Sequence, residues 1–261
     1  MSPPLRHLER WWRVFATGVS FATFGVCALC LSCALIPAGC LFVSGHRRRA
    51  ATAQRYISAS FRLFVWFMRA LRVLDYKIEN AARLRDDAGA LVVANHPTLI
   101  DYVFLTSLMP ACGCVVKTAL WNNFFMRGVI RLAGYIPNSE PATLLAACGA
   151  ELAAGGRILI FPEGTRTTPG EPLVLQRGAA NIAVRCGADL RVVRIACAPP
   201  VLTKHRPWWR TAPSRPFFTI SVGEKIRVAD FTAGGVPPSH AARLLNERLR
   251  AALSAPAATD G

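Results

Sequence analysis

The chain has 261 residues, a formal net charge of +16 and a hydrophobic fraction of 52%. This length allows one catalytic-size domain with an appendage, and the mean hydropathy of +0.31 is high for a soluble protein. A basic, hydrophobic chain favours an anionic membrane surface as its partner. Nucleic acid is not expected as a partner, because the basic residues are scattered and follow no recognisable binding motif.

The first predicted element is an apolar stretch from Val14 to Val43 that contains no charged residue. It exceeds the ~20 residues that cross a hydrocarbon core. It is also too long for the apolar part of a signal peptide. Pro37 and Gly39 interrupt it late. Residues 1–50 are therefore predicted to form a membrane segment, either one tilted and kinked helix or a re-entrant pair of short helices.

The flanks of this stretch predict its orientation. Trp11 and Trp12 stand at the front edge, where interfacial aromatic residues belong, and a basic run occupies 46–49. Positive residues favour the cytoplasmic side. The bulk of the chain is thus expected to lie on the cytoplasmic side of the membrane. Arg10 and Arg13 also flank the front, which favours the re-entrant arrangement.

Residues 51–80 are predicted to form an amphipathic interfacial helix and linker. Within 59–74, three arginines stand among Leu, Phe, Trp and Met, at a spacing that lets a helix lie along the membrane surface. The alternative is an ordinary core helix of the following domain.

The cysteines are interpreted as reduced thiols. Cys27, Cys30 and Cys33 resemble a cluster-ligand spacing, but they lie inside the apolar stretch, where small residues on one face of a membrane helix explain them better. The chain holds an odd number of cysteines, nine, without a paired pattern. No metal and no cofactor are expected.

Residues 81–254 are predicted to form an α/β domain with a mostly parallel sheet flanked by helices, because short β-rich runs alternate with helical ones. The expected strands are 90–95, 112–118, 156–162, 190–197 and 217–223. The expected helices are 98–109, 121–133, 141–154, 176–187 and 238–254. Residues 203–216 form a basic, Trp-rich loop suited to lipid headgroups, and 255–261 are expected to be a disordered tail.

A histidine and an aspartate follow the first of these strands, in Asn95-His96-Pro97-Thr98-Leu99-Ile100-Asp101. In one regular helix these two residues would lie about 140° apart, at roughly 100° per residue, and would not touch. If His96 stands just before the helix, however, Asp101 can fold back and accept its imidazole N–H. This arrangement of a base and its orienting carboxylate is one interpretation. A capping or core histidine is the other.

A second motif, "ILIFPEGTR", ends another strand and delivers Glu163 to Arg166 into a turn. Gly164 permits the close approach of a backbone N–H, and Arg166 offers a planar fork for phosphate. An ordinary turn with surface charges is the alternative.

The two motifs in this order resemble those of the glycerolipid acyltransferase family, and more narrowly the bacterial 1-acylglycerol-3-phosphate acyltransferases. The resemblance covers roughly residues 85–205. It implies that His96 is the general base and Asp101 its orienter. It also implies a set of substrate-binding residues: Lys117, Gly134, Pro137, Glu163, Gly164, Thr165 and Arg166.

Two positions depart from the family pattern. The second motif commonly ends in an arginine that grips the acceptor phosphate, and Glu140 stands in that place. The fourth motif usually carries a proline where this chain has Arg194. These departures concern the identity of the acceptor and leave the catalytic pair intact.

The resemblance implies direct transfer of an acyl group, from acyl-CoA or acyl carrier protein, to a lipid hydroxyl. The sn-2 hydroxyl of lysophosphatidic acid is the first expectation for the acceptor, in phospholipid synthesis. Two alternatives stay open: another lyso-lipid acceptor, such as an ornithine lipid or a specialised lipid, and a non-catalytic membrane protein that binds lipid.

Overall fold

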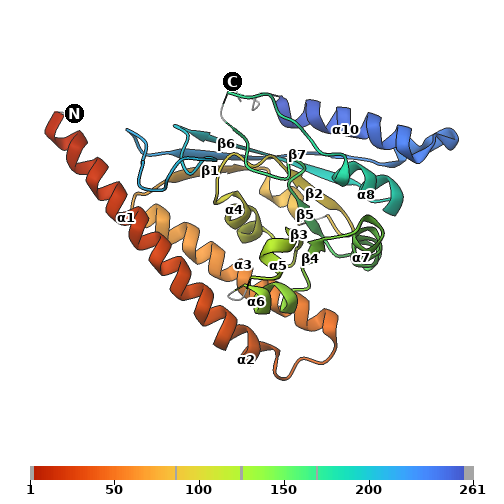
Figure 1. Ribbon diagram of the computed structural model, residues 1–261, viewed down its shortest axis with the longest axis horizontal. Coiled ribbons are helices and arrows are strands. Elements are labelled where there is room, and N and C mark those ends of the chain that lie inside the picture. The colour runs from red at the N-terminus through yellow and green to blue at the C-terminus, as the bar shows by residue number, and fades with distance from the viewer. Residues whose placement is uncertain (1–2, 86, 124–125, 169, 256–261) are drawn as a thin grey trace.

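The computed structural model describes residues 3–85, 87–123, 126–168 and 170–255. Its N-terminal part is one long helical run (Figure 1). Helix α1 (Pro3–Cys30) continues through a π-helical turn, η1 (Leu31–Leu35), into α2 (Ile36–Cys40). The π-turn ends two residues before Pro37. Because proline lacks an N–H and its ring crowds the preceding turn, a local widening is a common adjustment at such a point.

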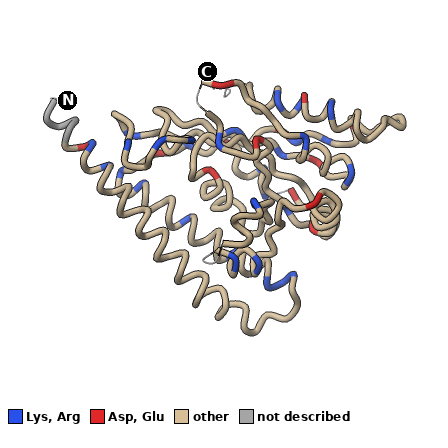
Figure 2. The backbone as a smooth tube through the Cα atoms, viewed as in Figure 1, with Lys and Arg blue, Asp and Glu red and all other residues tan. Residues whose placement is uncertain are grey.

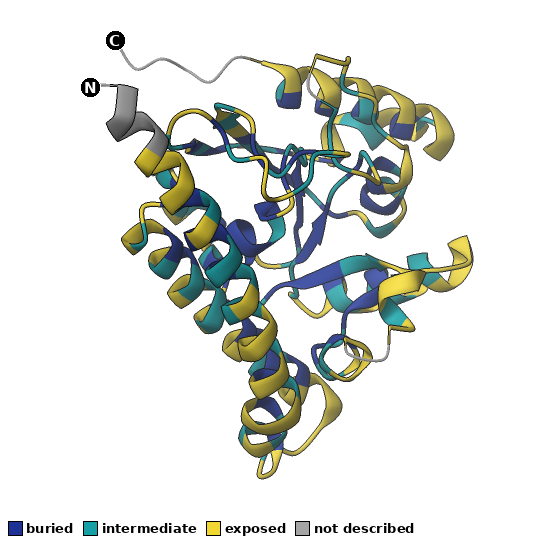
Figure 3. Cartoon of the chain, turned by 60° about the vertical axis from the view of Figure 1, so that its left-hand side comes forward, coloured by how far each residue is buried: buried dark blue, intermediate teal, exposed yellow. Residues whose placement is uncertain are grey.

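Within the described residues one helical run, Leu8–Cys40, is long and apolar enough to cross a membrane. Only 17% of its most apolar window is buried, so most of that window faces outward (Figure 3). A core helix of a soluble protein would bury much more. The helix therefore indicates membrane association, and it forms the apolar N-terminal element that the sequence predicts.

Helix α3 (His46–Ala70) follows a turn at Gly45 and packs back against α1 and onto α4 (Figure 1). Gly45 has a φ of 89°, a conformation that suits glycine. Helix α3 runs through the boundary expected between residues 50 and 51. One of its faces is buried through Val65 and Met68, whereas Leu63 and Trp66 are more than half exposed. The predicted interfacial helix is thus a helix with an apolar exposed face that also contributes to the core.

A seven-stranded sheet forms the centre of the domain, in the order β1-β7-β6-β2-β5-β3-β4. Every neighbouring pair is parallel except β6 and β7, which are antiparallel. The mostly parallel sheet predicted from the sequence is confirmed. The strands are β1 (Asp75–Glu79), β2 (Leu91–Ala94), β3 (Gly113–Lys117), β4 (Ile136–Asn138), β5 (Ile158–Ile160), β6 (Leu190–Ala198) and β7 (Phe217–Ile226).

Helices cover both faces of the sheet (Figure 1). One core lies under α3 and α4 (Asp101–Leu108) and includes Phe104 and Phe218. The other lies under α7 (Pro141–Ala153), α8 (Gly178–Cys186) and α10 (Pro238–Ser254), and includes Leu190 and Leu245. Strand β2 is buried on both faces, as expected of a central parallel strand. Short segments complete the fold: η2 (Ala81–Leu84), α9 (Ala229–Thr232) and η3 (Ala233–Gly235).

Some predicted elements differ from the structure. Strands β1 and β4 were not predicted. The single helix expected over 121–133 is wrong, since two short helices, α5 (Thr118–Trp121) and α6 (Arg127–Leu132), occupy this region. The Asn123 side chain accepts a hydrogen bond from the N–H of Met126 at 3.3 Å. This local bond competes with helical pairing. Of the predicted tail, 256–261 lie outside the described residues.

Residues 199–216 connect β6 to β7, and we call this connection the strap. It contains the basic, Trp-rich loop identified in the sequence. It has no regular helix or strand in the described structure.

Candidate active site

The two sequence motifs meet at one edge of the sheet. His96 follows the carboxyl end of β2, and the 161–166 turn follows the carboxyl end of β5. Strands β2 and β5 are parallel neighbours, with Val93 opposite Ile160. Parallel strands carry their carboxyl ends to the same edge, which is where α/β sheets bind ligands. The pairing of these two strands therefore brings together residues that are far apart in the sequence.

His96 and Asp101 form the contact that their spacing allows. His96 Nδ1 lies 2.9 Å from Asp101 Oδ2. Asp101 is the first residue of α4, and His96 lies before that helix. The Asp101 carboxylate therefore reaches back past the start of the helix. The Asp101 carboxylate is fully buried, whereas 20% of the His96 side chain is exposed. This is the geometry of a base with an orienting acid.

Further donors hold the Asp101 carboxylate. The backbone N–H of Thr98 donates to Oδ2 at 2.6 Å, and the Thr98 hydroxyl donates to Oδ1. Burial raises the pKa of Asp101, and the hydrogen bonds from His96 and Thr98 oppose that rise. With Nδ1–H donated to Asp101, Nε2 of His96 is the ring nitrogen able to accept a proton.

Glu163 fastens the second motif to the first. Its carboxylate accepts from the backbone N–H of His96 at 2.7 Å and from the Thr167 hydroxyl at 2.9 Å. The N–H of Thr167 in turn donates to the carbonyl of His96 at 2.7 Å. Phe161 stacks on the imidazole, with the ring centroids 4.3 Å apart. The position of His96 is thus fixed on both its backbone and its ring.

The remaining predicted site residues fall into two groups. Gly164, Thr165, Arg166 and Lys117 line the same cavity as His96. Gly134 and Pro137 are not among the described residues that line this cavity.

Gly134 has a structural role instead. It follows the end of α6 at a φ of 62°, and a Cβ there would come within 3.1 Å of Ala50. This glycine therefore serves a turn and the close packing of α3.

Arg166 is partly engaged within the chain. Its Nη1 donates to the carbonyls of Leu202 and Thr203 in the strap, at 3.0 and 3.2 Å. The N–H of Leu99, next to the first motif, also donates to the Leu202 carbonyl, at 3.1 Å. Arg166 and the residues beside His96 are thus tied to the same point of the strap.

The cavity that these residues line has a volume of about 1100 Å³ and a mostly apolar wall. It extends from His96 to helices α1 and α3, where Phe24 and Phe61 contribute to its wall. Their rings stack with centroids 6.0 Å apart. The space therefore joins the His96 imidazole to the helices that carry the apolar outer face, and its size and lining suit long hydrocarbon chains.

Sequence reasoning missed several residues of this site. Thr98 and Asp101 form a T-x-x-D pattern in which the acid reaches back to the threonine N–H, a helix-start signal that the sequence does contain. Tyr102 and Tyr135 also line the cavity, and their hydroxyls are hydrogen-bonded at 2.5 Å. Burial raises the pKa of Tyr102 well above its ordinary value, so this phenol stays neutral. No sequence pattern pairs these two tyrosines, because they come from different elements.

The two departures from the family pattern have local structural roles. The exposed carboxylate of Glu140 accepts from the N–H groups of Ala142 and Thr143, at the start of α7. It thereby caps that helix. Arg194 Nη1 donates to the carbonyl of Ala255 at 2.9 Å, which ties β6 to the end of the described chain. Both residues are absent from the described cavity lining.

Comparison with known proteins agrees with this geometry. The Acyltransferase family model matches residues 75–198, a range that holds both motifs. The chain thus carries an Acyltransferase-family domain over residues 75–198. It is accordingly an O-acyltransferase, and the non-catalytic alternative considered for the sequence is not supported.

Named relatives of this acyltransferase come from distant organisms. It is 24% identical over 231 residues to human 1-acyl-sn-glycerol-3-phosphate acyltransferase beta, covering 81% of this chain and 75% of the human protein. It is 34% identical over 105 residues to the 1-acyl-sn-glycerol-3-phosphate acyltransferase of Helicobacter pylori, covering 37% of this chain and 44% of that protein.

A solved structure shares the fold. The crystal structure of the 1-acyl-sn-glycerophosphate (LPA) acyltransferase PlsC from Thermotoga maritima superimposes with a TM-score of 0.65, at 18% identity, and covers 95% of both chains. A share this large extends beyond the α/β domain into the N-terminal helices. At this identity the likeness concerns the architecture.

Proposed function

We propose that this acyltransferase moves a fatty acyl group from a thioester, acyl-CoA or acyl carrier protein, to the sn-2 hydroxyl of lysophosphatidic acid. The observation that carries the proposal is the His96–Asp101 pair, in which His96 lines a large apolar cavity and Asp101 is buried behind it. Two relatives support this acceptor, since the human and Helicobacter pylori proteins are named 1-acyl-sn-glycerol-3-phosphate acyltransferases.

In the proposed reaction, Nε2 of His96 takes the proton from the acceptor hydroxyl as that oxygen attacks the thioester carbonyl. Asp101 holds the ring and stabilises the imidazolium that forms. The tetrahedral oxyanion needs donors, for which backbone N–H groups near the two motifs are suited. Its collapse breaks the carbon–sulfur bond. The departing thiolate takes the proton from His96, so that ester and thiol are the products and the base is restored.

The phosphate of the acceptor is assigned to Arg166 and Lys117, the two cations in the described wall of the cavity. Arg166 uses Nη1 on the strap carbonyls. A guanidinium carries five N–H donors, so others remain for a ligand. Glu140 carries no positive charge and cannot replace the arginine that the family commonly has in its place.

The test of this function is transfer of a labelled acyl group to a panel of acceptors by the purified full-length chain. The panel contains lysophosphatidic acid, a monoacylglycerol without phosphate, and lyso-ornithine lipid, each with acyl-CoA and with acyl carrier protein. We expect the highest kcat/KM with lysophosphatidic acid. A higher value for lyso-ornithine lipid would replace the proposed acceptor, and the two donors can be compared in the same assay.

Replacing Arg166 is expected to raise the KM for lysophosphatidic acid. A charge-assisted contact contributes about 1.5–3 kcal/mol, which corresponds to roughly tenfold to a hundredfold or more in binding. Steady-state kinetics of Arg166→Ala with lysophosphatidic acid and with a phosphate-free monoacylglycerol measures the difference. Equal losses with both acceptors would show that Arg166 acts by holding the strap, and the phosphate assignment would then be wrong.

Replacing Glu163 is expected to lower kcat more than it changes KM. In Glu163→Ala the backbone N–H of His96 loses its carboxylate, a bond to a charged group of about 1.5–3 kcal/mol, and the base loses its position. In Glu163→Gln the amide oxygen can still accept this bond, so a large part of the activity should return. The same kinetic assay on both variants checks this. A change confined to KM in both would indicate direct contact with the substrate.

We place the enzyme at the bacterial inner membrane with its α/β domain on the cytoplasmic side. The support is the apolar run Leu8–Cys40 and the basic residues at 46–49. In inside-out vesicles, added protease should cleave the α/β domain. Protection in those vesicles together with cleavage in intact spheroplasts would reverse the orientation.

A further inference from the structure

The strap is strongly basic and rich in tryptophan. Residues 199–216 contain four cations and no Asp or Glu, and Trp208 and Trp209 stand next to each other among the cations. Tryptophan and basic side chains together are typical of segments at a membrane–water interface. Composition alone does not place the strap at a membrane. Its position against α1 supplies the structural argument for that placement.

The strap is bound to the beginning of the apolar helix. Arg13 of α1 is 5% exposed, and its Nη2 donates to the carbonyl of Pro213 at 2.8 Å and to that of Ala212 at 3.4 Å. Trp208 packs against Phe21, with the ring centroids 5.8 Å apart. These contacts keep the strap beside the first turns of the apolar run.

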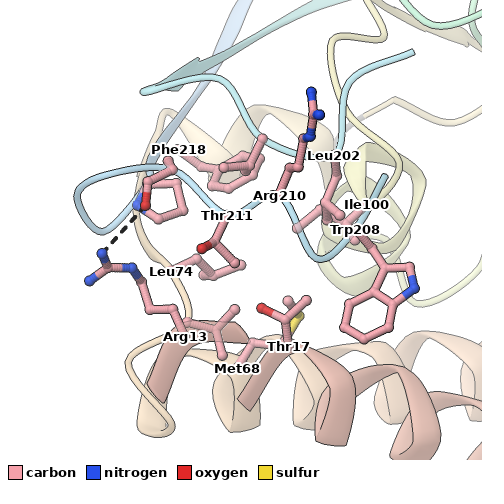
Figure 4. Close-up of a pocket in the computed structure, with 14 residues that line it drawn as sticks. Arg13, Thr17, Met68, Leu74, Ile100, Leu202, Trp208, Arg210, Thr211 and Phe218 are labelled. Atoms are coloured by element: carbon pink, nitrogen blue, oxygen red, sulfur yellow. Dashed lines mark hydrogen bonds between the residues drawn. The ribbon is translucent and has the colours of Figure 1, made fainter. Parts of the chain in front are cut away.

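A small cavity lies between the two segments. Figure 4 shows Arg13 and Thr17 of α1 on one side of it and Thr211 of the strap on the other. The strap therefore lies against α1 without belonging to the large cavity beside His96, whose described lining contains no strap residue.

This position lies where α1 changes from charged to apolar. Arg13 is the last charged residue before the uncharged stretch that begins at Val14, and Figure 2 shows the charged positions of α1 gathered near its start. If α1 enters a bilayer, Arg13 stands at the level of the lipid headgroups, and the strap is held at the same level. Trp11, on the same part of α1, is 73% exposed, and Trp209 of the strap is 58% exposed. Exposed tryptophans therefore come from both segments at this level.

The cations of the strap differ in their partners. Arg215 binds the carboxylate of Asp75 at 3.2 Å and the carbonyl of Leu74, so it serves the fold. For Lys204, Arg206 and Arg210, no carboxylate partner is found in the described part of the chain. Figure 4 shows the guanidinium of Arg210 directed away from the small cavity. Among the described residues, these three positive charges thus have no carboxylate as a counter-charge.

We propose that the strap is a second membrane-docking element, which binds the phosphates of anionic lipid headgroups through Lys204, Arg206 and Arg210 and places Trp209 in the interfacial layer. The partner is an anionic bilayer surface, because the charge of the strap is of one sign and its tryptophans suit the headgroup region. Each cation near such a surface strengthens docking by about fivefold, so the three together contribute about a hundredfold.

The test is amide hydrogen exchange of the full-length chain in lipid nanodiscs. One set contains phosphatidylcholine alone, and the other contains equal parts of phosphatidylcholine and phosphatidylglycerol. The strap also supports Arg166, so exchange is measured in place of activity. The result then does not depend on the proposed acyl transfer. We expect strap amides to exchange about tenfold more slowly in the anionic nanodiscs, since docking restricts their opening.

The charge variant Lys204→Gln/Arg206→Gln/Arg210→Gln should lose this protection. A matched control, Arg243→Gln/Arg248→Gln/Arg250→Gln, removes the same charge from exposed positions of α10 and should keep it. Unchanged exchange of β2 and β6 shows that each variant is folded. Equal strap exchange in both nanodiscs for the unsubstituted chain would overturn the proposal. So would undiminished protection in the strap variant, or its loss in the α10 control.

Discussion

His96→Ala is expected to lower kcat for acyl transfer by about 10²–10⁴-fold, the usual contribution of a general base. The imidazole is partly exposed at the cavity wall, so its removal should leave the fold intact. Turnover is measured by transfer of a labelled acyl group under saturating substrates, and folding by thermal unfolding of the same preparation. His240→Ala is a suitable control, because His240 is exposed on α10.

Asp101→Asn should lose activity to a similar extent for a different reason. An amide in this position can hold the imidazole in the tautomer that protonates Nε2, which then cannot accept the proton of the hydroxyl. Thr98 still offers its N–H and hydroxyl to the new side chain. Near-normal turnover in either His96→Ala or Asp101→Asn would mean that another group is the base.

Asp87→Ala is expected to destabilise the fold by about 3–5 kcal/mol, because it leaves a buried cation without its partner. Asp87 is fully buried, and Arg191 binds it through two bonds of 2.7 Å. Lys225 lies 3.2 Å from the same carboxylate. Chemical denaturation of the detergent-solubilised chain measures the change in the free energy of unfolding.

The exposed pair Arg227–Asp230 provides the control. Its side chains are 72% and 55% exposed, and surface pairs contribute about 0–1 kcal/mol. Asp230→Ala should therefore change the free energy of unfolding little. Replacing Asp87 and Arg191 together by Leu and Met should recover a large part of the stability lost in Asp87→Ala. Equal effects of Asp87→Ala and Asp230→Ala would show that burial of the Asp87–Arg191 pair does not change its contribution to the free energy of unfolding.

The local sequence pattern was sufficient to predict those strands whose residues are mainly apolar and buried. The central strands β2 and β5 are short apolar runs, and β6 is longer and mostly apolar. The predicted ranges contain these strands or end within one residue of them. Strand β1 was not predicted, because residues 75–79 were included in the interfacial helix and linker expected over 51–80. Asp75, Lys77 and Glu79 do alternate with apolar residues, but a single run of five residues becomes a strand here through its pairing with β7. Helices α5 and α6 were merged because a break at Asn122–Asn123 depends on side-chain bonding that periodicity does not report.

For the site, the sequence identified the reactive residues but did not show which residues contact one another. The spacing of His96 and Asp101 allowed their hydrogen bond once His96 stood outside the helix, and the structure has that bond. Glu163 looked like a substrate ligand by its place in the motif, yet its carboxylate lies on the backbone N–H of His96. That contact could not be read from the sequence, because it depends on the lateral pairing of β2 and β5.

The sequence by itself determined the class of chemistry, the mostly parallel α/β domain and the apolar N-terminal helix, because each follows from residue type and short-range periodicity. Tertiary structure alone decided how distant segments meet. It set α3 against α1, paired Asp87 with Arg191, and bound the strap to Arg13 at one end and Arg166 at the other. The physical reason is that such contacts satisfy buried charges and carbonyls across long sequence separations, where local preference carries no information.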